Sequence, residues 1–333
     1  MGFKNVGTYD LNMVSLGQGR AVAMTDKAIS SGKAFLTSEL EKRDNLVRTP
    51  LTSFTYGRDI PVRVGGGWVD SVSAMSVGYG LAGGSGDNII ANGAADGTPL
   101  VTADFSKETF KAHAVTTGTR IFWIDQQRGN ITGRSLDTIL RDGVRMVYDK
   151  HMDENVYTGF ARYKTTGLIN NPDVTITNAS KTFAAANADE ILAIINDSII
   201  TAWKNAGYDR DAIPNHILLP YDQYNKLITR KVSNDASKSI LTYLLENNIA
   251  KANGVDLFIG ATQFNAGAGV GSKDRMVVYV NKEKYIAVDE LVPLTRAITS
   301  VNADRFSYDT AYAGNVSEAQ VFYTETILYV DGV

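Results

Sequence analysis

Cysteine is absent from all 333 residues, which excludes disulfides, thiol catalysis and cysteine metal sites. Histidine is scarce, and His113, His151 and His216 are too far apart in sequence to form a local metal-binding motif. No apolar run reaches eighteen residues, so no membrane-spanning helix is expected. The net charge of −3 gives no electrostatic basis for a dedicated nucleic-acid binder, which would carry a basic stripe.

Catalytic signatures are missing too. The sequence contains no GxSxG, no HExxH and no Gly-Lys-Ser/Thr phosphate loop. We interpret the three histidines as packed or surface residues, and the acidic clusters at 149–154 and 209–211 as a solvated helix face and a turn. The sequence therefore predicts no catalytic residues, no cofactor-binding residues and no metal site.

Glycine is abundant in one segment, residues 78–99, which reads GYGLAGGSGDNIIANGAADGTP. Its first six residues, Gly78–Gly83, match the dinucleotide-binding pattern GxGxxG. That site needs a helix directly after the turn, and each glycine costs a helix about 1 kcal/mol relative to alanine. Because glycines stand at 80, 83, 84 and 86, we interpret the segment as a flexible loop. A nucleotide-dependent enzyme that uses Gly78–Gly83 is kept as an alternative.

Two alternating segments flank this loop. Residues 54–77 and 100–124 both alternate apolar and polar side chains, which predicts a long β-hairpin with a loose tip. An isolated two-stranded ribbon is only marginally stable in water. We therefore expect the hairpin to lie on a surface supplied by its own domain or by a neighbouring subunit.

A long amphipathic helix is predicted over Ser135–Thr158, with Ser135 as N-cap and Gly159 just past the end. Its expected core-facing stripe is Leu136, Ile139, Leu140, Gly143, Val147 and His151.

An α/β block follows. Asn187 and Glu190 form a capping-box pattern, which predicts the start of a helix. Residues 214–219 predict a buried strand, and Pro220 at N1 predicts a helix over 221–229. Ser237 is the expected N-cap of a further helix. Beyond 276 we expect mostly strands, with a hairpin loop at 281–284 and one long strand over 319–330.

This order of elements resembles the major capsid protein of tailed bacteriophages, the Hong Kong 97-type fold, in the α+β class. Two local segments are similar to ones common in that family: Gly-Leu-Ile-Asn-Asn-Pro at 167–172 and Ile-Leu-Leu-Pro-Tyr-Asp-Gln-Tyr at 217–224. The resemblance implies an N-terminal arm with a short helix over 1–53 and an extended hairpin, the E-loop, over 54–118 with its tip at 78–98. It also implies a peripheral (P) domain over 119–180 with its spine helix at 135–158, an axial (A) domain over 181–275, and P-domain strands over 276–333.

The resemblance also implies a function. Such a chain self-assembles into pentamers and hexamers that form an icosahedral shell around double-stranded DNA, which it contacts non-specifically. Its expected partners are a portal and decoration proteins, and its expected locations are the virion capsid and, during assembly, the host cytoplasm, with no membrane. Contacts between subunits are expected from Gly78, Tyr79, Gly80, Asn88, Ile89, Ile90, Trp68, Arg58 and Arg63.

Two departures from some family members refine these expectations. The residues before Ser135 are taken up by the arm and the E-loop, so a separate scaffolding protein is expected. Residues 44–106 contain no lysine, so no covalent Lys–Asn crosslink is expected from the tip. A bacterial encapsulin, whose shell has this fold and encloses an enzyme, is an alternative that the sequence leaves open.

Overall fold

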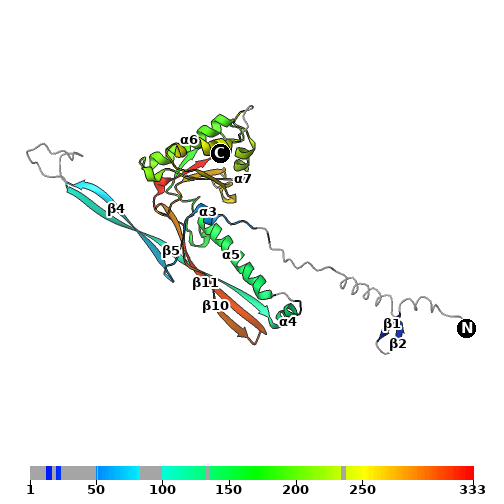
Figure 1. Ribbon diagram of the computed structural model, residues 1–333. Coiled ribbons are helices and arrows are strands. Elements are labelled where there is room, and N and C mark those ends of the chain that lie inside the picture. The colour runs from blue at the N-terminus through cyan, green and yellow to red at the C-terminus, as the bar shows by residue number, and fades with distance from the viewer. Residues whose placement is uncertain are drawn as a thin grey trace, which may run out of the picture. The chain divides into compact units, whose positions relative to one another are not determined.

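The computed structural model describes residues 13–16, 20–23, 50, 52–82, 100–132, 135–233 and 238–333. The chain divides into two units, Met1–Thr52 and Ser53–Val333. In the first unit, β1 (Met13–Leu16) and β2 (Arg20–Ala23) form an antiparallel pair. The remaining described elements belong to the second unit, and they confirm the predicted α+β class (Figure 1).

A five-stranded sheet in the order β6-β13-β9-β7-β8 forms part of the second unit. Its strands are β6 (Thr175–Asn178), β7 (His216–Leu219), β8 (Phe258–Ala261), β9 (Arg275–Tyr279) and β13 (Ile327–Asp331). The strands β7, β9 and β13 are buried along their whole lengths. Because both faces of these strands are covered, they read in sequence as continuous apolar runs.

Helices pack on one face of this sheet, where Figure 1 shows α6 and α7. They are α6 (Ala188–Asn205), α7 (Tyr221–Thr229), α8 (Ile240–Glu246) and α9 (Ile249–Ala252). The predicted capping box of α6 is confirmed: Asn187 Oδ1 accepts from the Glu190 N–H at 2.8 Å, and Glu190 Oε2 accepts from the Asn187 N–H at 3.0 Å.

The other face of the sheet shares a core with α5 (Leu136–Thr158), to which the helix contributes Tyr148, Met152 and Val156. The predicted ends of α5 are confirmed. The Ser135 hydroxyl accepts from the Thr138 N–H, and Gly159 has a φ of 77°. A Cβ at Gly159 would lie 2.3 Å from the Thr165 carbonyl oxygen, so both backbone conformation and space require glycine there.

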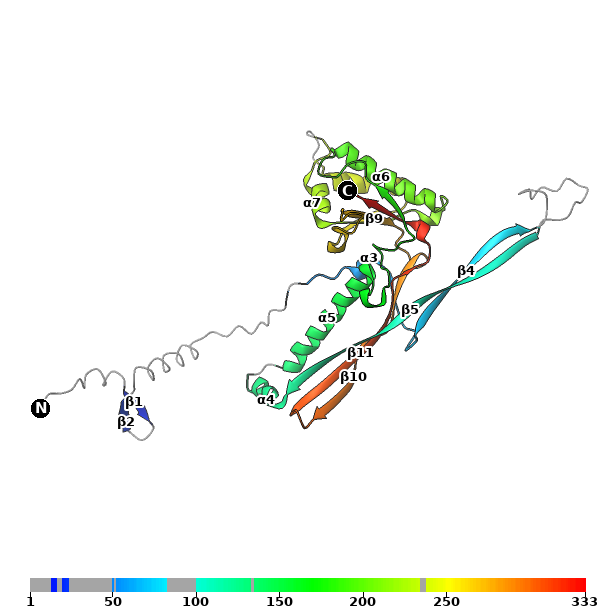
Figure 2. The same cartoon turned by 180° about the vertical axis from the view of Figure 1, so that it is seen from behind.

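A six-stranded sheet runs in the order β12-β10-β11-β5-β4, and β3 also pairs with β10. Its strands are β3 (Val62–Val64), β4 (Ser71–Ala82), β5 (Leu100–Phe122), β10 (Ile286–Asn302), β11 (Ser307–Ser317) and β12 (Gln320–Val321). The strand β5 leads into α4 (Trp123–Thr132). It also changes partner along its length: residues 112–122 pair with β11, and residues 100–111 pair with β4 (Figure 2).

The extended conformation predicted across 54–77 is wrong in its first part. Residues Tyr56–Asp59 form the short helix α3, and Val62–Val64 pairs in parallel with β10 rather than extending the hairpin. The helix forms because Asp153 of α5 accepts the backbone N–H groups of Thr55 and Tyr56, at 2.9 and 2.8 Å. This partner is remote in sequence, so no local pattern signals it.

Two further strand predictions are wrong because the chain changes sheets. Residues 281–284 do not close a hairpin, since β9 is already paired with β7 and β13, and β10 joins the other sheet. The predicted strand over 319–330 is split by the 3-10 turn η4 (Thr324–Thr326) into β12 and β13, which lie in different sheets.

Helix starts need smaller corrections. Pro220 is the N-cap of α7 rather than its N1 residue. Ser239 caps α8, and the predicted cap Ser237 lies outside the described residues. The short helix expected in the N-terminal arm also lies outside the described residues.

Candidate functional site

Three expected contact residues, Gly78, Tyr79 and Gly80, lie within β4 opposite Asp104, Ala103 and Thr102 of β5. The strand continues to Ala82, so the hairpin tip begins no earlier than residue 83, and the predicted tip at 78 is wrong. Two glycines of GxGxxG thus occupy a strand and not the turn that a dinucleotide phosphate requires. The expected contacts Asn88, Ile89 and Ile90 lie outside the described residues.

The paired segment Ser71–Ala82 and Leu100–Lys111, here called the ribbon, has two unlike faces. Residues opposite each other in an antiparallel pair share a face, and successive residues alternate. Towards the far end of the ribbon, one face carries Val77 and Tyr79 with Val101, Ala103 and Phe105, and the other carries Gly78 and Gly80 with Thr102, Asp104 and Ser106. Nearer the root, the first face carries Met75 opposite Lys107, and the second carries Val72 opposite Phe110. The apolar face is bare: Tyr79 is 78% exposed and Phe105 is 66% exposed.

The exposed apolar face of the ribbon is continuous with a covered face of β5. The registers of β5 with β4 and with β11 contain no bulge, so the odd-numbered residues of β5 form one face throughout. From Val115 to Ile121 these residues are partly buried, while the even-numbered ones between them are exposed. Val115 packs against the core that contains Tyr148 and Met152 of α5. The same face of β5 is therefore covered by α5 at one end and left apolar and open at the other.

Two other expected contact residues flank the start of the ribbon. Trp68, in the link between β3 and β4, is 61% exposed and accessible for a contact. Arg63 of β3 is instead engaged within the chain, because its guanidinium donates to both Asp289 oxygens, at 2.5 and 3.0 Å, and to Gln320 Oε1 at 2.7 Å.

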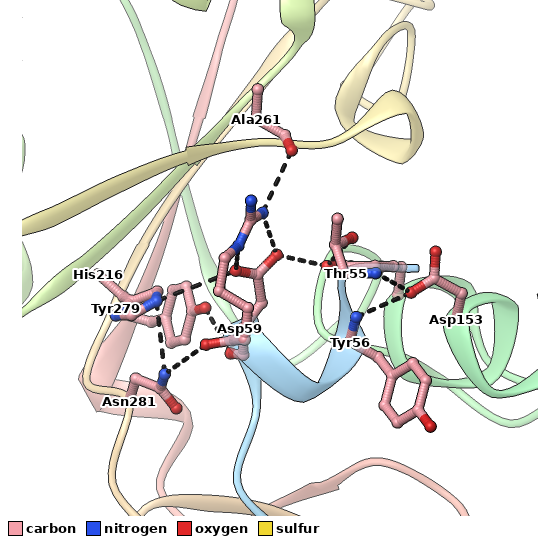
Figure 3. A network of polar contacts seen from close by, with 10 residues as sticks. Thr55, Tyr56, Asp59, Asp153, His216, Ala261, Tyr279 and Asn281 are labelled. Atoms are coloured by element: carbon pink, nitrogen blue, oxygen red, sulfur yellow. Dashed lines mark hydrogen bonds and ion pairs between the residues drawn. The ribbon is translucent and has the colours of Figure 1, made fainter. Parts of the chain in front are cut away.

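Arg58 lies at a junction of three elements. Figure 3 shows the polar network around its neighbour Asp59. Its guanidinium donates to both oxygens of Asp59, at 2.6 and 2.7 Å, and to the Ala261 carbonyl of β8 at 3.2 Å. The hydroxyl of Tyr157, at the end of α5, also donates to Asp59, and the Tyr279 hydroxyl of β9 donates to the Asp59 carbonyl at 2.6 Å. Arg58 thus connects α3 to the five-stranded sheet, and Asp59 connects α3 to α5.

His216 completes this junction, with Nε2 3.9 Å from Asp59 Oδ1 and 3.4 Å from Asn281 Nδ2. Burial lowers the pKa of His216 to about 4, although the Asp59 carboxylate acts to raise it. Burial, reinforced by Asp59, raises the pKa of Tyr157. These groups are neutral near pH 7 and their contacts are internal, so the junction is a structural tie. The sequence did not signal it, because its members are scattered from residue 55 to 281.

Helix α5 also has an uncovered apolar stripe. Its buried side chains include Val144, Tyr148, Met152 and Val156, whereas Ile139 and Val147 of the predicted core-facing stripe are exposed. Gly143 lies between them with open space where a side chain would be. The predicted stripe of α5 is therefore only partly covered: Leu136, Leu140 and Gly143 are partly buried, whereas Ile139 and Val147 are exposed beside the buried stripe.

A groove of about 670 Å³ lies between α5 and β10, lined by opposite charges such as Arg145 and Asp149 rather than by a convergent set. Across the described ranges, no group of three or more histidine and carboxylate side chains is arranged to hold a metal ion. Within those same ranges, no helix is both long and apolar enough to cross a membrane.

Comparisons with known proteins agree with this architecture. A model of the major capsid protein family matches residues 86–333. The capsid of Myoviridae phage XM1 is similar in structure at a TM-score of 0.74 and 18% identity, covering 89% of this chain and 98% of that one. The capsid of a native GTA particle has a TM-score of 0.63 at 12% identity, covering 93% and 99%. A protein of Microbacterium phage Oxtober96 has a TM-score of 0.60 at 12% identity, covering 90% and 98%.

No curated protein sequence matches the chain. The structural likenesses, all at low identity, concern the fold, and the family match covers most of the chain. Together they do not favour the encapsulin alternative. The chain belongs to the major capsid protein family and is a shell-forming capsid protein.

Proposed function

We propose that this chain builds a Hong Kong 97-type icosahedral shell of pentamers and hexamers around double-stranded DNA, and that the apolar face of its ribbon lies on a neighbouring copy. In this role it works as a structural protein without enzymatic activity. It assembles in the host cytoplasm with a portal and a separate scaffolding protein, and decoration proteins bind the finished virion capsid.

The observation that carries this proposal is the half-covered face of β5. Its odd-numbered side chains are covered by α5 near β11, and beyond Lys111 they include the exposed Phe105 and Val101. An isolated ribbon is marginal in water, and a contiguous exposed apolar patch marks an interaction surface. A second copy of the chain is the partner present in highest number in a shell, so it is the natural cover for this face.

The uncovered stripe on α5 supplies a matching surface in every copy. Ile139 and Val147 are exposed on it, and Gly143 leaves room for a close approach between them. An extended ribbon laid along this stripe would bury apolar side chains on both partners. Each α5 would then cover two surfaces: the odd-numbered face of β5 in its own chain, and the ribbon of a neighbouring copy.

The charge of the chain supports a container rather than a DNA-binding protein. Its net charge of −3 offers few counterion-releasing contacts to phosphates, so packaged DNA would be held by confinement and not by tight binding. Of the other expected subunit contacts, Trp68 and Tyr79 remain the best placed because both rings are exposed.

The test is a carboxylate on the apolar face of the ribbon. Burying a phenylalanine side chain is worth about 1.5–3 kcal/mol, and an unpaired carboxylate in its place costs more still. Phe105→Asp should leave a folded subunit by circular dichroism but sharply reduce shells in sedimentation and negative-stain microscopy. Ser106→Asp, one residue along and on the opposite face, is the matched control and should assemble. Normal shells from Phe105→Asp would refute the proposal.

A further inference from the structure

The ribbon leaves the rest of the unit at one point, where β5 exchanges β11 for β4 between Lys111 and Ala112. The even face of β5 is anchored here by Phe110, which is only 8% exposed. Its ring meets the Phe322 ring edge-on, with centroids 5.6 Å apart and planes at 87°. Arg63, itself held by Asp289, lies over the other ring, with its Cζ 5.7 Å from the Phe322 centroid.

The odd face is anchored at the same level by His113. Its ring stacks on Tyr163 at 4.2 Å and 18°, and meets Phe160 edge-on at 5.3 Å and 81°. Both partners come from the segment that directly follows α5. The ring nitrogen Nε2 of His113 is buried without a hydrogen-bond partner, so on this side the ring acts through packing.

The backbone between these two anchors is pinned as well. The Lys111 N–H donates to Glu318 Oε1 at 2.9 Å, and the Glu318 N–H donates to the Lys111 carbonyl at 3.1 Å. We call the five rings at this point the aromatic clamp: Phe110, His113, Phe160, Tyr163 and Phe322.

The second arm of the ribbon is held at its root by hydrogen bonds rather than by aromatic rings. It enters β4 through Gly65, Gly66 and Gly67, whose φ values are 116°, 124° and 78°. All residues from 64 to 70 are exposed. Hydrogen bonds hold this link: the Gly65 and Gly67 N–H groups donate to the Glu290 and Leu291 carbonyls at 3.1 and 3.2 Å, and the Asn315 amide donates to the Gly67 and Val69 carbonyls at 3.3 and 2.9 Å. The Ala112 N–H of β5 also donates to the Asp70 carbonyl at 2.9 Å. The glycine link is thus tied by hydrogen bonds at exposed positions, whereas β5 is also packed between aromatic rings on both of its faces.

We infer that the aromatic clamp sets the direction in which the ribbon leaves the subunit, and thereby the angle at which neighbouring copies meet in the shell. His113 is a positioning residue in this device. The inference rests on the proposed function, in which the ribbon lies on a neighbour. A strand of 12 residues spans roughly 40 Å, so a tilt of about 10° at its root displaces the far end by roughly 7 Å. That exceeds a side chain's width and would misplace the apolar face.

The inference can be tested by spin labelling. Because the chain has no cysteine, two introduced cysteines would carry the only spin labels. Asp104→Cys on the ribbon and Lys150→Cys on α5 place the labels at two exposed positions. Double electron–electron resonance on the unassembled full chain should give a narrow distance distribution. His113→Ala should broaden it, and His113→Phe should keep it narrow because the ring contacts survive. Shells of His113→Ala should vary in diameter, while those of His113→Phe should match the unmodified chain.

Tyr163→Ala is the second variant should His113→Ala fail to fold, since Tyr163 is 54% exposed and tolerates truncation better. Tyr221→Ala, at 52% exposure on α7, is its matched control and should change neither readout. Distributions for His113→Ala and Tyr163→Ala as narrow as that of the unmodified chain would overturn the inference. Broad distributions with uniform shells would overturn the link to shell geometry. Phe105→Asp leaves the clamp intact, so it tests the proposed function separately.

Discussion

Asp59 has no exposed surface, yet its carboxylate receives the guanidinium of Arg58 and the hydroxyl of Tyr157 and lies close to His216. A buried charge is tolerated only when such partners satisfy it, and removing one partner leaves a costly unpaired charge. This tie connects the start of the second unit to elements more than ninety residues away in sequence. It therefore contributes to stability only once the complete fold is assembled.

The pH dependence of unfolding tests this arrangement at His216. The unfolded chain protonates this ring below its ordinary pKa of about 6.5, whereas the folded chain does so only near a pKa of about 4. The folded state thus binds fewer protons in this range, and the free energy of unfolding falls as the pH drops from about 6.5 to about 4. The full loss is on the order of 3 kcal/mol.

His216→Gln should therefore lose less stability than the unmodified chain when urea unfolding is compared at pH 7 and pH 4.5. His151→Gln, an exposed position on α5, is the control. The charged groups near His216, Asp59 and Arg58, remain in both chains, so the difference isolates the ring. An equal loss in His216→Gln and the unmodified chain would show that this histidine does not titrate as described.

Among the elements, α5 shows how far local sequence signals reach. Its first and last residues were predictable because Ser135 and Gly159 act locally as caps. Its buried face was not, because apolar residues occupy two adjacent stripes, and only the contacts of the folded chain select Tyr148 and Met152 over Ile139 and Val147. If the second stripe is covered by a neighbour, as we propose, both stripes are apolar for packing reasons and no single-chain pattern can separate them.

Val147→Asp tests the second stripe of α5. Because Val147 is exposed in the subunit, the substitution should change the free energy of unfolding of the subunit in urea by less than about 0.5 kcal/mol. Shell yield by sedimentation should nevertheless fall, since the carboxylate would be buried against the neighbouring ribbon. Thr138→Asp, exposed and on the opposite side of the helix, is the control and should assemble. Unchanged yield from Val147→Asp would exclude this stripe as the receiving surface.

Strand pairing was predictable only where it is local. The ribbon was expected from two alternating segments around a glycine-rich loop, and β4 pairs with β5 as that pattern indicates. The strands β10 and β13 do not follow the same reasoning, because β10 leaves the sheet of the preceding β9 and β13 leaves the sheet of the preceding β12. Arg58 and Arg63 were expected to contact a neighbouring subunit. Within the chain, Arg58 pairs with the adjacent Asp59, and the fold brings Asp289 to Arg63.

At the scale of the whole molecule, the second unit has one apolar surface that its own chain does not cover. The strand β5 carries one face from a region covered by α5 to a region where Phe105, Val101 and Tyr79 of the ribbon are exposed. A monomeric protein would be expected to cover or charge such a face. In the shell that we propose, the same face would be buried on a neighbouring copy, so apolar burial would be completed only on assembly.

The most direct test places a photoreactive benzoylphenylalanine at position 105, where it conserves the ring and the apolar character of Phe105. Irradiated shells should yield a crosslinked dimer on denaturing gels, with the crosslinked peptide from the second copy lying in α5 near Val147. The same group at position 106, on the opposite face, should yield none. Shells that form normally but give only monomers after irradiation at position 105 would contradict the claim that a neighbouring copy covers this face.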